Sequence, residues 1–176
     1  PPSVYASTKL SGEILSKIMM EDTSTNLLIP RFFTVYGPYG RPDMSILRFI
    51  HWIIEEKEVL VLGDGEQMRS FTYIDDVVEA LLLMMDYKES NTFNIGSNTT
   101  VSLNEVIKTI EKYSGKEANI KNEERAYKDP DVVRPNLENI SNELNWKPST
   151  NIEAGIEKTV SWYSENKEFL NDIVYI

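Results

Sequence analysis

The apolar residues of the chain follow two alternating patterns, and the alternation predicts an α/β fold. Apolar residues spaced three and four apart indicate amphipathic helices, whereas short apolar runs indicate buried strands. Extended segments are expected at 27–33, 59–62, 68–74, 92–96 and 118–121. Because helical patterns lie between them, the sequence favours parallel strands with helices packed on their faces.

Local signals place the helices between these strands. The first helix is expected over about 5–20, where Leu10, Ile14 and Ile18 recur at four-residue intervals. Its broad apolar face fits either a sheet or a second subunit, and the sequence favours neither. The later helices are expected to begin near Ser45, at Asp75 as the N-cap, at the capping boxes Ser102–Glu105 and Thr150–Glu153, and at Glu138 for a short helix that ends at Leu144.

Two of these helices show well-marked apolar faces. The helix near Ser45 carries its face on Ile46, Phe49, Ile50 and Ile53, and the helix after Asp75 carries its face on Val77, Val78, Leu81, Leu82 and Met85. His51 lies within the first of them. It is interpreted as a surface or packing residue, because nothing near it in the sequence would orient it for catalysis.

Composition narrows the classes of function. The chain has 176 residues, 41% of them hydrophobic, which suits one domain or a large part of a two-lobed one. A net charge of −10 argues against general binding to nucleic acids or anionic membranes. With no cysteine and one histidine, thiolate and His-rich metal sites are excluded. No apolar run could span a bilayer and no signal peptide is visible, so a cytoplasmic protein is expected.

The first chemical signal is a tyrosine and a lysine four residues apart, Tyr5 and Lys9, at the start of the first helix. Residues at this spacing share one helix face. A positive charge beside a phenol stabilises the phenolate, which a tyrosine needs in order to act as a base near neutral pH. Taken alone, such a spacing more often marks a solvated helix face, so its interpretation depends on the motifs in the rest of the chain.

Two loops rich in glycine and proline supply further candidates. The loop 34–44 leaves the strand 27–33 at its C-terminal end, the edge at which open α/β sheets bind ligands. A tight turn at 63–67 precedes Arg69, and a proline-bounded loop at 129–136 holds Arg134. Planar guanidinium groups suit phosphate oxygens.

Four segments, in this order, resemble the extended short-chain dehydrogenase/reductase family, and within it the nucleotide-sugar epimerases and dehydratases. They are Y-x-x-x-K at 5–9, RFFTVYGP at 31–38, GDGEQMRSFTYIDDV at 63–77, and the late pieces NIGS at 94–97 and LNWKP at 144–148. Together they cover nearly the whole chain. One segment alone would be weak, but four in the family's order are specific.

The resemblance implies a fold and a division of the chain. The expected fold is the C-terminal part of a Rossmann-like doubly wound sheet joined to a small mixed α/β substrate-binding lobe. Residues 1–35 and 68–97 would belong to the NAD-binding domain, and residues 36–67 and 98–176 to the nucleotide-sugar-binding lobe.

The resemblance also assigns roles to residues at the cofactor. Tyr5 would be the acid/base that exchanges a proton with a sugar hydroxyl while a hydride moves to or from NAD. Lys9 would bind the ribose of the cofactor and favour the ionised form of Tyr5. Phe33 would line the nicotinamide pocket.

Three further residues would contact the nucleotide sugar. Arg69 would pair with the diphosphate, and Arg134 would make a second phosphate or ribose contact. Thr34 stands where many relatives have asparagine, so its contact to the sugar nucleotide is altered or shorter. Ser70 stands where aspartate is frequent, which is expected to weaken a local anchor.

The loop 36–44 resembles UDP-glucuronate 4-epimerases, and the tail 129–135 resembles UDP-glucuronate decarboxylases. A UDP-hexose or UDP-uronate substrate is therefore expected, epimerised through transient oxidation at C4, with UDP-glucose 4-epimerase close behind. The alternatives are a UDP-glucuronate decarboxylase or sugar-nucleotide 4,6-dehydratase, and a non-catalytic sugar-nucleotide-binding or assembly module.

The 176 residues lack the family's G-x-x-G-x-x-G turn, on which the cofactor pyrophosphate rests. The family's catalytic serine or threonine upstream of the tyrosine is absent as well. The chain is therefore expected to be the C-terminal portion of an enzyme, inactive alone and unable to bind NAD tightly. An uncovered edge on the strand 27–33 would favour a homodimer, formed through the helix that carries Tyr5.

Overall fold

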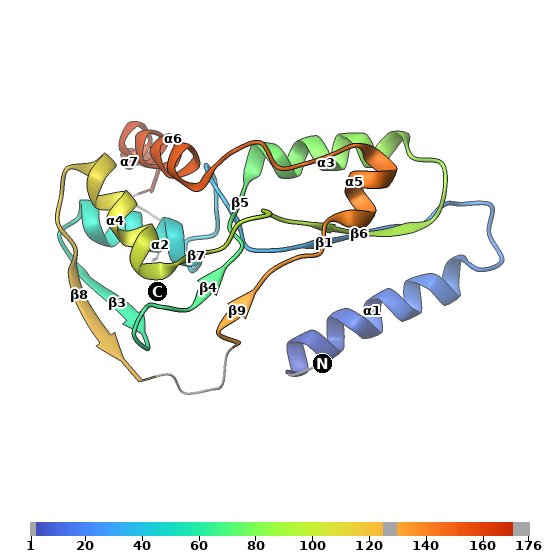
Figure 1. Cartoon of the computed structure of the whole chain (residues 1–176), viewed down its shortest axis with the longest axis horizontal. Helices are drawn as coiled ribbons and strands as arrows, with labels where there is room; N and C mark the ends of the chain where they lie inside the picture. The colour runs from blue at the N-terminus through green and yellow to red at the C-terminus, as the bar shows by residue number, and fades with distance from the viewer. Residues whose placement is uncertain (1–2, 125–129, 171–176) are drawn as a thin grey trace.

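The computed structural model describes residues 3–124 and 130–170, in which helices alternate with short strands as the apolar pattern predicts (Figure 1). The helices are α1 (Val4–Met20), α2 (Ser45–Ile54), α3 (Ile74–Asp86), α4 (Leu103–Ser114), α5 (Glu138–Leu144), α6 (Ile152–Glu165) and α7 (Lys167–Leu170). The strands are β1 (Leu28–Phe32), β2 (Val35–Tyr36), β3 (Glu58–Leu62), β4 (Met68–Arg69), β5 (Thr72–Tyr73), β6 (Asn91–Ile95), β7 (Val101–Ser102), β8 (Asn119–Glu123) and β9 (Val132–Val133).

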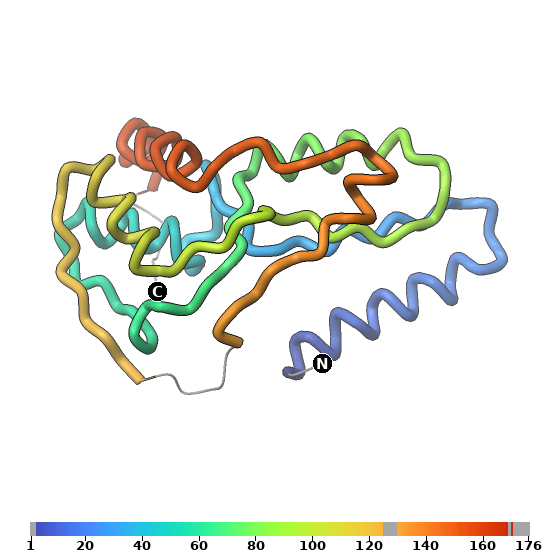
Figure 2. Tube along the Cα trace, viewed as in Figure 1, coloured from blue at the N-terminus to red at the C-terminus, as the bar shows by residue number. Residues whose placement is uncertain are grey.

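Most strand pairs join segments that are far apart in the sequence, and Figure 2 shows their paths side by side. β1 pairs with β6, β2 with β5 and β3 with β8, and all three pairs are parallel. β4 lies between antiparallel β7 and parallel β9. The predominance of parallel pairs linked by helices confirms the α/β class expected from the sequence.

Two hydrophobic cores support these strands. In the first, α2, α4 and α6 pack around β3, with Ile50, Val59 and Ile110 fully buried. In the second, α3 and α5 pack on β6, around Phe93 and Trp146. The face expected for α2 is confirmed, because all four of its predicted residues are buried.

A buried carboxylate fastens the segment before α6 to α3. Asp76 is 3% exposed, and its oxygens accept hydrogen bonds from the backbone N–H and hydroxyl groups of Ser149 and Thr150 at 2.9–3.3 Å. Such charge-assisted bonds are stronger than neutral ones. The contact therefore fixes the start of α6, a helix of the first core, to a helix of the second.

The predicted face of α3 is wrong in part. Val77 of the predicted face is buried, but Val78, Leu82 and Met85 are 45%, 59% and 75% exposed, and the helix buries Ala80 and Met84 instead. The apolar residues cover more than one side of the helix, and packing against β6 and α5 determines which side faces the core. The N-cap is Tyr73 rather than Asp75, which lies in the first turn, where a carboxylate favours a helix N-terminus.

The two predicted capping boxes have different outcomes. At α4 the box is confirmed, with the Ser102 hydroxyl and the Glu105 carboxylate each accepting the other residue's backbone N–H. At α6 it is wrong, because the Asn151 side chain accepts from Ala154 N and is the cap. The Thr150 hydroxyl instead donates to the Asp76 carboxylate, and the Glu153 carboxylate pairs with Lys112.

Strand β1 is parallel as predicted, but it is not buried. Its residues are half-buried or exposed, Phe32 by 51%, and within the described residues β1 pairs only with β6. The bonds Asn91 N–Leu27 O and Phe33 N–Ile95 O show that odd-numbered residues face β6. Pro30, which has no N–H, therefore faces the open edge and removes no bond from this pair.

His51 is held more firmly than its sequence neighbours indicate. Its Nδ1 lies 2.7 Å from the Tyr163 hydroxyl and its Nε2 lies 2.9 Å from Lys57 Nζ. Because an ammonium only donates, Nε2 accepts and the ring is neutral, with Nδ1–H donating to Tyr163. Burial lowers the pKa of His51, and the charge of Lys57 lowers it further. The expectation that nothing nearby orients His51 is thus wrong, and its role here is to join α2 to α6.

Among residues 3–124 and 130–170, no helix combines the length and apolarity needed to cross a membrane. No cluster of histidine and acidic residues suited to a metal ion occurs in that part of the chain either.

Candidate active site

The start of α1 presents Tyr5 and Lys9 together. The Ser3 hydroxyl caps the helix by accepting a hydrogen bond from Ala6 N at 3.1 Å, so Tyr5 stands in the first turn. Lys9 Nζ lies 5.3 Å from the centroid of the Tyr5 ring. Tyr5 is 71% exposed, which leaves its hydroxyl accessible to a ligand. Pro2, the first residue of the motif region, lies outside the described residues.

A hollow of about 900 Å³ separates α1 from β1, and three of the predicted site residues line it. Tyr5 and Lys9 stand on the helix side, and Phe33 stands on the opposite wall with Asn94. In Figure 1, α1 runs below β1 and β6, on the side opposite to α3. The structure therefore brings a hydroxyl, an ammonium and an aromatic ring around one space.

An ion pair holds the middle of α1 against β1. Arg31 donates to Glu13 through Nε at 2.7 Å and through Nη2 at 2.5 Å. The hydrogen bond from Arg31 lowers the pKa of the Glu13 carboxyl. The bidentate pair joins the middle of α1 to β1, and both of its residues line the hollow.

Gly96, at the end of β6, connects the hollow to the loop that carries Arg134. A Cβ on Gly96 would lie 2.7 Å from Pro135 Cγ and 3.2 Å from Phe33 Cβ, so only glycine lets these residues approach. Beside it, Asn94 Nδ2 donates to Asn136 O at 3.0 Å. Arg134 itself is exposed and lines a neighbouring hollow of about 490 Å³.

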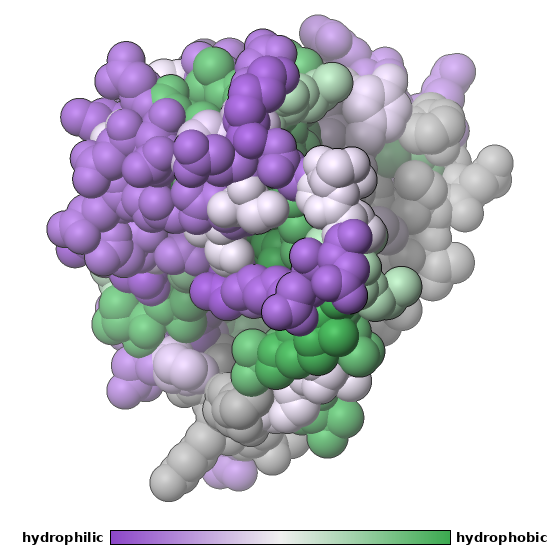
Figure 3. Space-filling model, turned by 90° about the vertical axis from the view of Figure 1, so that its right-hand side faces the viewer, coloured by the Kyte–Doolittle hydropathy of each residue, from purple (hydrophilic) through white to green (hydrophobic). Residues whose placement is uncertain are grey.

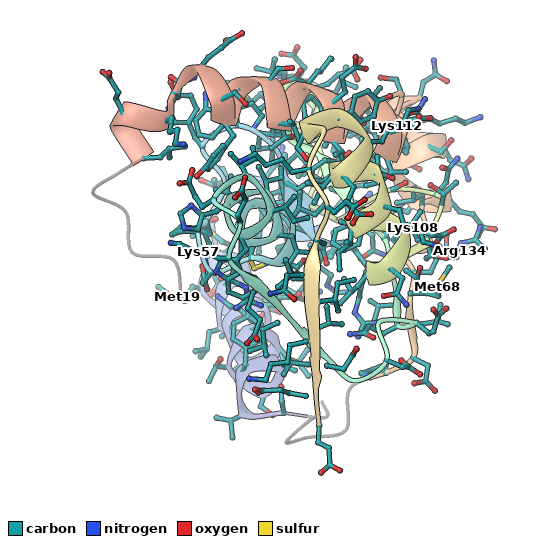
Figure 4. The ribbon with its side chains drawn as sticks, turned by 90° about the vertical axis from the view of Figure 1, so that its left-hand side faces the viewer. Met19, Lys57, Met68, Lys108, Lys112 and Arg134 are labelled. Atoms are coloured by element: carbon teal, nitrogen blue, oxygen red, sulfur yellow. The ribbon has the colours of Figure 1, made fainter. Side chains whose placement is uncertain are left out.

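The other predicted contacts to the sugar nucleotide lie outside the hollow at Tyr5. Thr34 lines a smaller hollow beside α2, and its carbonyl accepts from Thr72 N at 2.8 Å. Arg69 is half-buried, and its Nη1 donates to Met68 O at 2.7 Å and lies 3.4 Å from Asp131 O. Figure 4 places Arg134 and Met68 on one side of the molecule, and Met19 of α1 on the other. Asp129, which opens the predicted loop, lies outside the described residues.

Ser70, expected to be a weakened anchor, bonds to the segment after β6. Its buried hydroxyl donates to Ser97 O at 2.9 Å and accepts from Ser97 N at 3.0 Å. This pair ties the segment after Arg69 to the segment after Gly96. In the sequence, Ser70 is recognisable only as a serine between two extended segments. Its partner, Ser97, could not be identified from the sequence.

The sequence reasoning also missed Arg41, in the loop after β2. Arg41 donates to Asp43 through Nε at 3.1 Å and Nη2 at 2.6 Å. This hydrogen bond raises the pKa of Arg41. Arg41 lines the same small hollow as Thr34.

The apolar face of α1 remains exposed. None of its residues is buried, and Ile14, Leu15, Ile18 and Met19 are 50–71% exposed. Figure 3 views the end of the molecule at which α1 ends and shows hydrophobic side chains in its lower part, below a mostly hydrophilic upper part. Packing on the sheet, one of the two interpretations of this face, does not account for it.

Comparisons with known proteins agree on one family. A model of the NAD-dependent epimerase/dehydratase family matches residues 1–96, more than half of the chain. A UDP-glucuronate 4-epimerase from Thermodesulfobacterium geofontis is 38% identical over 174 residues, which are 98% of this chain and 54% of that protein. The chain spans about half the length of the curated relatives it matches.

Solved structures give the same result. A UDP-glucuronic acid 4-epimerase from Bacillus cereus, in complex with UDP-glucuronic acid and NAD, has a TM-score of 0.88 at 33% identity, covering 94% of this chain and 54% of that one. A UDP-glucose 4-epimerase from Thermotoga maritima with UDP-glucose has a TM-score of 0.89 at 26% identity, covering 95% of this chain and 55% of that one. These likenesses confirm the Rossmann-like fold expected from the motifs.

Proposed function

This chain belongs to the NAD-dependent epimerase/dehydratase family, and on that basis we propose that it supplies the catalytic pair and the sugar-nucleotide contacts of an NAD-dependent nucleotide-sugar 4-epimerase. The substrate is a UDP-hexose or UDP-uronate, with UDP-glucuronate first. The observation that carries the proposal is the convergence of Tyr5, Lys9 and Phe33 on one hollow between α1 and β1. The names of the relatives support the choice of substrate.

The residues around the hollow fit the nicotinamide end of NAD. The Lys9 ammonium donates hydrogen bonds of the kind that ribose hydroxyls accept, and the Phe33 ring offers a flat apolar wall to the nicotinamide. When bound there, NAD would take up the hydride from C4 of the sugar and return it.

Tyr5 is the residue that accepts and returns the proton in the proposed reaction. Its oxygen takes the proton of the C4 hydroxyl while the C4–H bond breaks, which leaves a ketone at C4. It later gives the proton back to the same sugar oxygen, after the sugar has presented its opposite face. Lys9 stabilises the negative charge that Tyr5 carries before it accepts the proton.

The sugar nucleotide would extend from this hollow toward the other lobe. We assign the diphosphate to Arg69 and Arg134 and a sugar contact to Thr34. Residues 1–35 and 68–97 would form the cofactor side, and residues 36–67 and 98–176 the nucleotide-sugar side. The contact of Phe33, Gly96 and Pro135 supports this path, because it joins the wall of the hollow to the loop that carries Arg134.

The test is an assay of the protein at its natural length with NAD and UDP-glucuronate or UDP-glucose, with products identified by NMR. We expect the 4-epimer of at least one substrate, and no product from residues 1–176 alone, because these residues lack the glycine-rich turn. A pentose product with release of carbon dioxide, or a 4-keto-6-deoxy sugar, would replace epimerisation by decarboxylation or dehydration. Loss of UDP binding in Arg69→Ala, measured by titration calorimetry, would support the assigned diphosphate contact.

A homodimer through α1 accompanies this proposal. The helix exposes an apolar stripe that includes Leu10, Ile14 and Ile18, and such a stripe is stabilised by burial against a second copy. Sedimentation velocity should show a dimer in the wild type and a shift toward monomer in Ile14→Glu/Ile18→Glu. A wild-type monomer at micromolar concentration would contradict the proposal.

A further inference from the structure

The helix that carries Tyr5 and Lys9 is attached to the rest of the chain mainly through one ion pair. No residue of α1 is buried, and none belongs to either hydrophobic core. Among residues 3–124 and 130–170, the hydrogen bonds that leave α1 for another element are the two that Arg31 donates to Glu13. In Figure 1, α1 lies apart from the other helices. Because a catalytic pair must be held in a defined geometry, this attachment bears on the proposed reaction.

The ion pair lies beside the residues proposed for the reaction. On the helix, Tyr5, Lys9 and Glu13 follow one another at four-residue intervals, so they share one face. On the strand, Arg31 precedes Phe33 by two positions, and the bond from Phe33 N to Ile95 O shows that strand pairing continues to this residue. Side chains two apart leave the same face of an extended chain. The pair thus joins the two walls of the hollow one helical turn from Lys9 and two residues from Phe33.

The contact has a geometry that fixes orientation as well as distance. Glu13 Oε1 accepts from Arg31 Nε at 2.7 Å, and Oε2 accepts from Nη2 at 2.5 Å. Parallel bonds between a planar guanidinium and a carboxylate give such geometric specificity. The Glu13 side chain is only 16% exposed. Both of its oxygens bond to Arg31, while the Lys9 ammonium, one turn away, lies over the Tyr5 ring.

We propose that Glu13 and Arg31 are positioning residues for the epimerase reaction, whose ion pair holds α1 against β1 and so places Tyr5 and Lys9 opposite Phe33. The inference rests on the proposed function for the identity of the reaction. Neither residue exchanges a proton or a hydride. The proposal assigns a role to the part of the hollow that lies beyond Lys9 along α1.

Steady-state kinetics of the protein at its natural length test the placement. Glu13→Gln leaves one acceptor in place of two and removes the charge, so it should lower kcat about 10- to 100-fold, the loss expected when reacting groups move by about 1 Å. The KM of the nucleotide sugar should change less than about twofold, because the proposed diphosphate contacts, Arg69 and Arg134, do not lie on α1. A wild-type kcat, or a loss confined to KM, would overturn the proposal.

Glu56→Gln is the matched control. Glu56 pairs with Lys116 at 2.8 Å, and 60 positions separate the two residues in the sequence. Neither residue lines the hollow at Tyr5, so this variant should keep the wild-type kcat and KM. Equal losses of kcat in Glu56→Gln and Glu13→Gln would show a general effect of losing an ion pair and would contradict a positioning role for Glu13.

The partner residue supplies the coupling test. Arg31→Met should lower kcat by a similar factor, and Glu13→Gln/Arg31→Met should lower it no further, because each single change already breaks the pair. Recovery of the wild-type kcat in the double variant would show that a free Glu13 carboxylate near Lys9 causes the loss in Arg31→Met. Multiplied losses would show that the two residues act separately. Either result would refute the positioning pair.

Hydrogen exchange separates this inference from the proposed function, because it needs no turnover. A helix released from β1 opens more often, so the backbone amides of α1 from Lys9 to Lys17 should exchange several-fold faster in Glu13→Gln and Arg31→Met than in the wild type or Glu56→Gln. If the wild type lacks epimerase activity, the proposed function fails, while exchange still decides whether the pair holds α1. Unchanged protection of these amides in both variants would refute the inference whatever the activity.

Discussion

Replacing Tyr5 with phenylalanine is expected to lower kcat for epimerisation about a thousand-fold, within the range that a general acid–base group contributes. The change removes one oxygen and keeps the ring, so the cation–π contact with Lys9 and the cap at Ser3 are preserved. Because Tyr5 is 71% exposed, the free energy of unfolding should hardly change. The measurement is the rate of 4-epimer formation by the protein at its natural length, with NAD and UDP-glucuronate.

A matched control is available in Tyr113→Phe. Tyr113 also has an exposed hydroxyl with a charged neighbour, since its oxygen lies 3.2 Å from Glu153 Oε1, but it stands on α4, which does not line the hollow at Tyr5. This variant should keep the wild-type kcat. If Tyr5→Phe retained more than about a tenth of the wild-type kcat, the oxygen of Tyr5 would not be the group that exchanges the proton, and the proposed mechanism would be wrong.

The parts of the fold that could be predicted are those decided by neighbours in the sequence. The spacing of Tyr5 and Lys9 on one face follows from helix geometry alone. The capping box at Ser102 and Glu105 uses only groups within four residues of one another, and it is present as expected. The face of α2 was predictable because its apolar residues form a single stripe.

The predictions of helix caps and faces are wrong where a residue distant in the sequence determines the structure. Thr150 has the sequence of a helix cap, but the buried carboxylate of Asp76 takes its hydroxyl, and Asn151 becomes the cap instead. The side of α3 that turns inward is chosen by β6 and α5, which no pattern within α3 reports. Val78 and Leu82 are apolar and still exposed for that reason.

The same division holds for the candidate site. The sequence places Tyr5 and Lys9 on one helix, but their convergence with Phe33 requires that α1 lie against β1, to which an ion pair joins it. Arg41 and Tyr39 gave no periodic signal, because a loop has none. The stack of Tyr39 on Trp162 and the small hollow that Arg41 lines with Thr34 exist only in the folded chain.

Gly155→Ala is expected to destabilise the protein by about 2 kcal/mol, although the same change in a helix interior ordinarily stabilises by up to about 1 kcal/mol. Gly155 lies in the first turn of α6 directly against Tyr36. An added Cβ would overlap the Tyr36 hydroxyl oxygen and lie 2.7 Å from Cζ. The ring cannot retreat, because Tyr36 is 5% exposed and packs edge-on against Phe71 and Tyr73, with centroids 6.3 and 5.6 Å away.

Gly12→Ala isolates the intrinsic preference of the helix from this clash. Gly12 lies within α1, and an added Cβ there has no atom within 4 Å among the described residues, so the change should leave the urea midpoint unchanged or raise it.

A double variant tests whether the Tyr36 oxygen causes the clash. Tyr36→Phe/Gly155→Ala removes the Tyr36 hydroxyl oxygen, the atom nearest to the added Cβ, and keeps ring carbon Cζ. The double variant should therefore lose less stability than the two single losses added together. Additive losses would mean that the Tyr36 oxygen does not cause the destabilisation. Coupled losses would show that Gly155 is required because α6 approaches β2 so closely, which is the contact that seats α6 beside the loop carrying Tyr39 and Arg41.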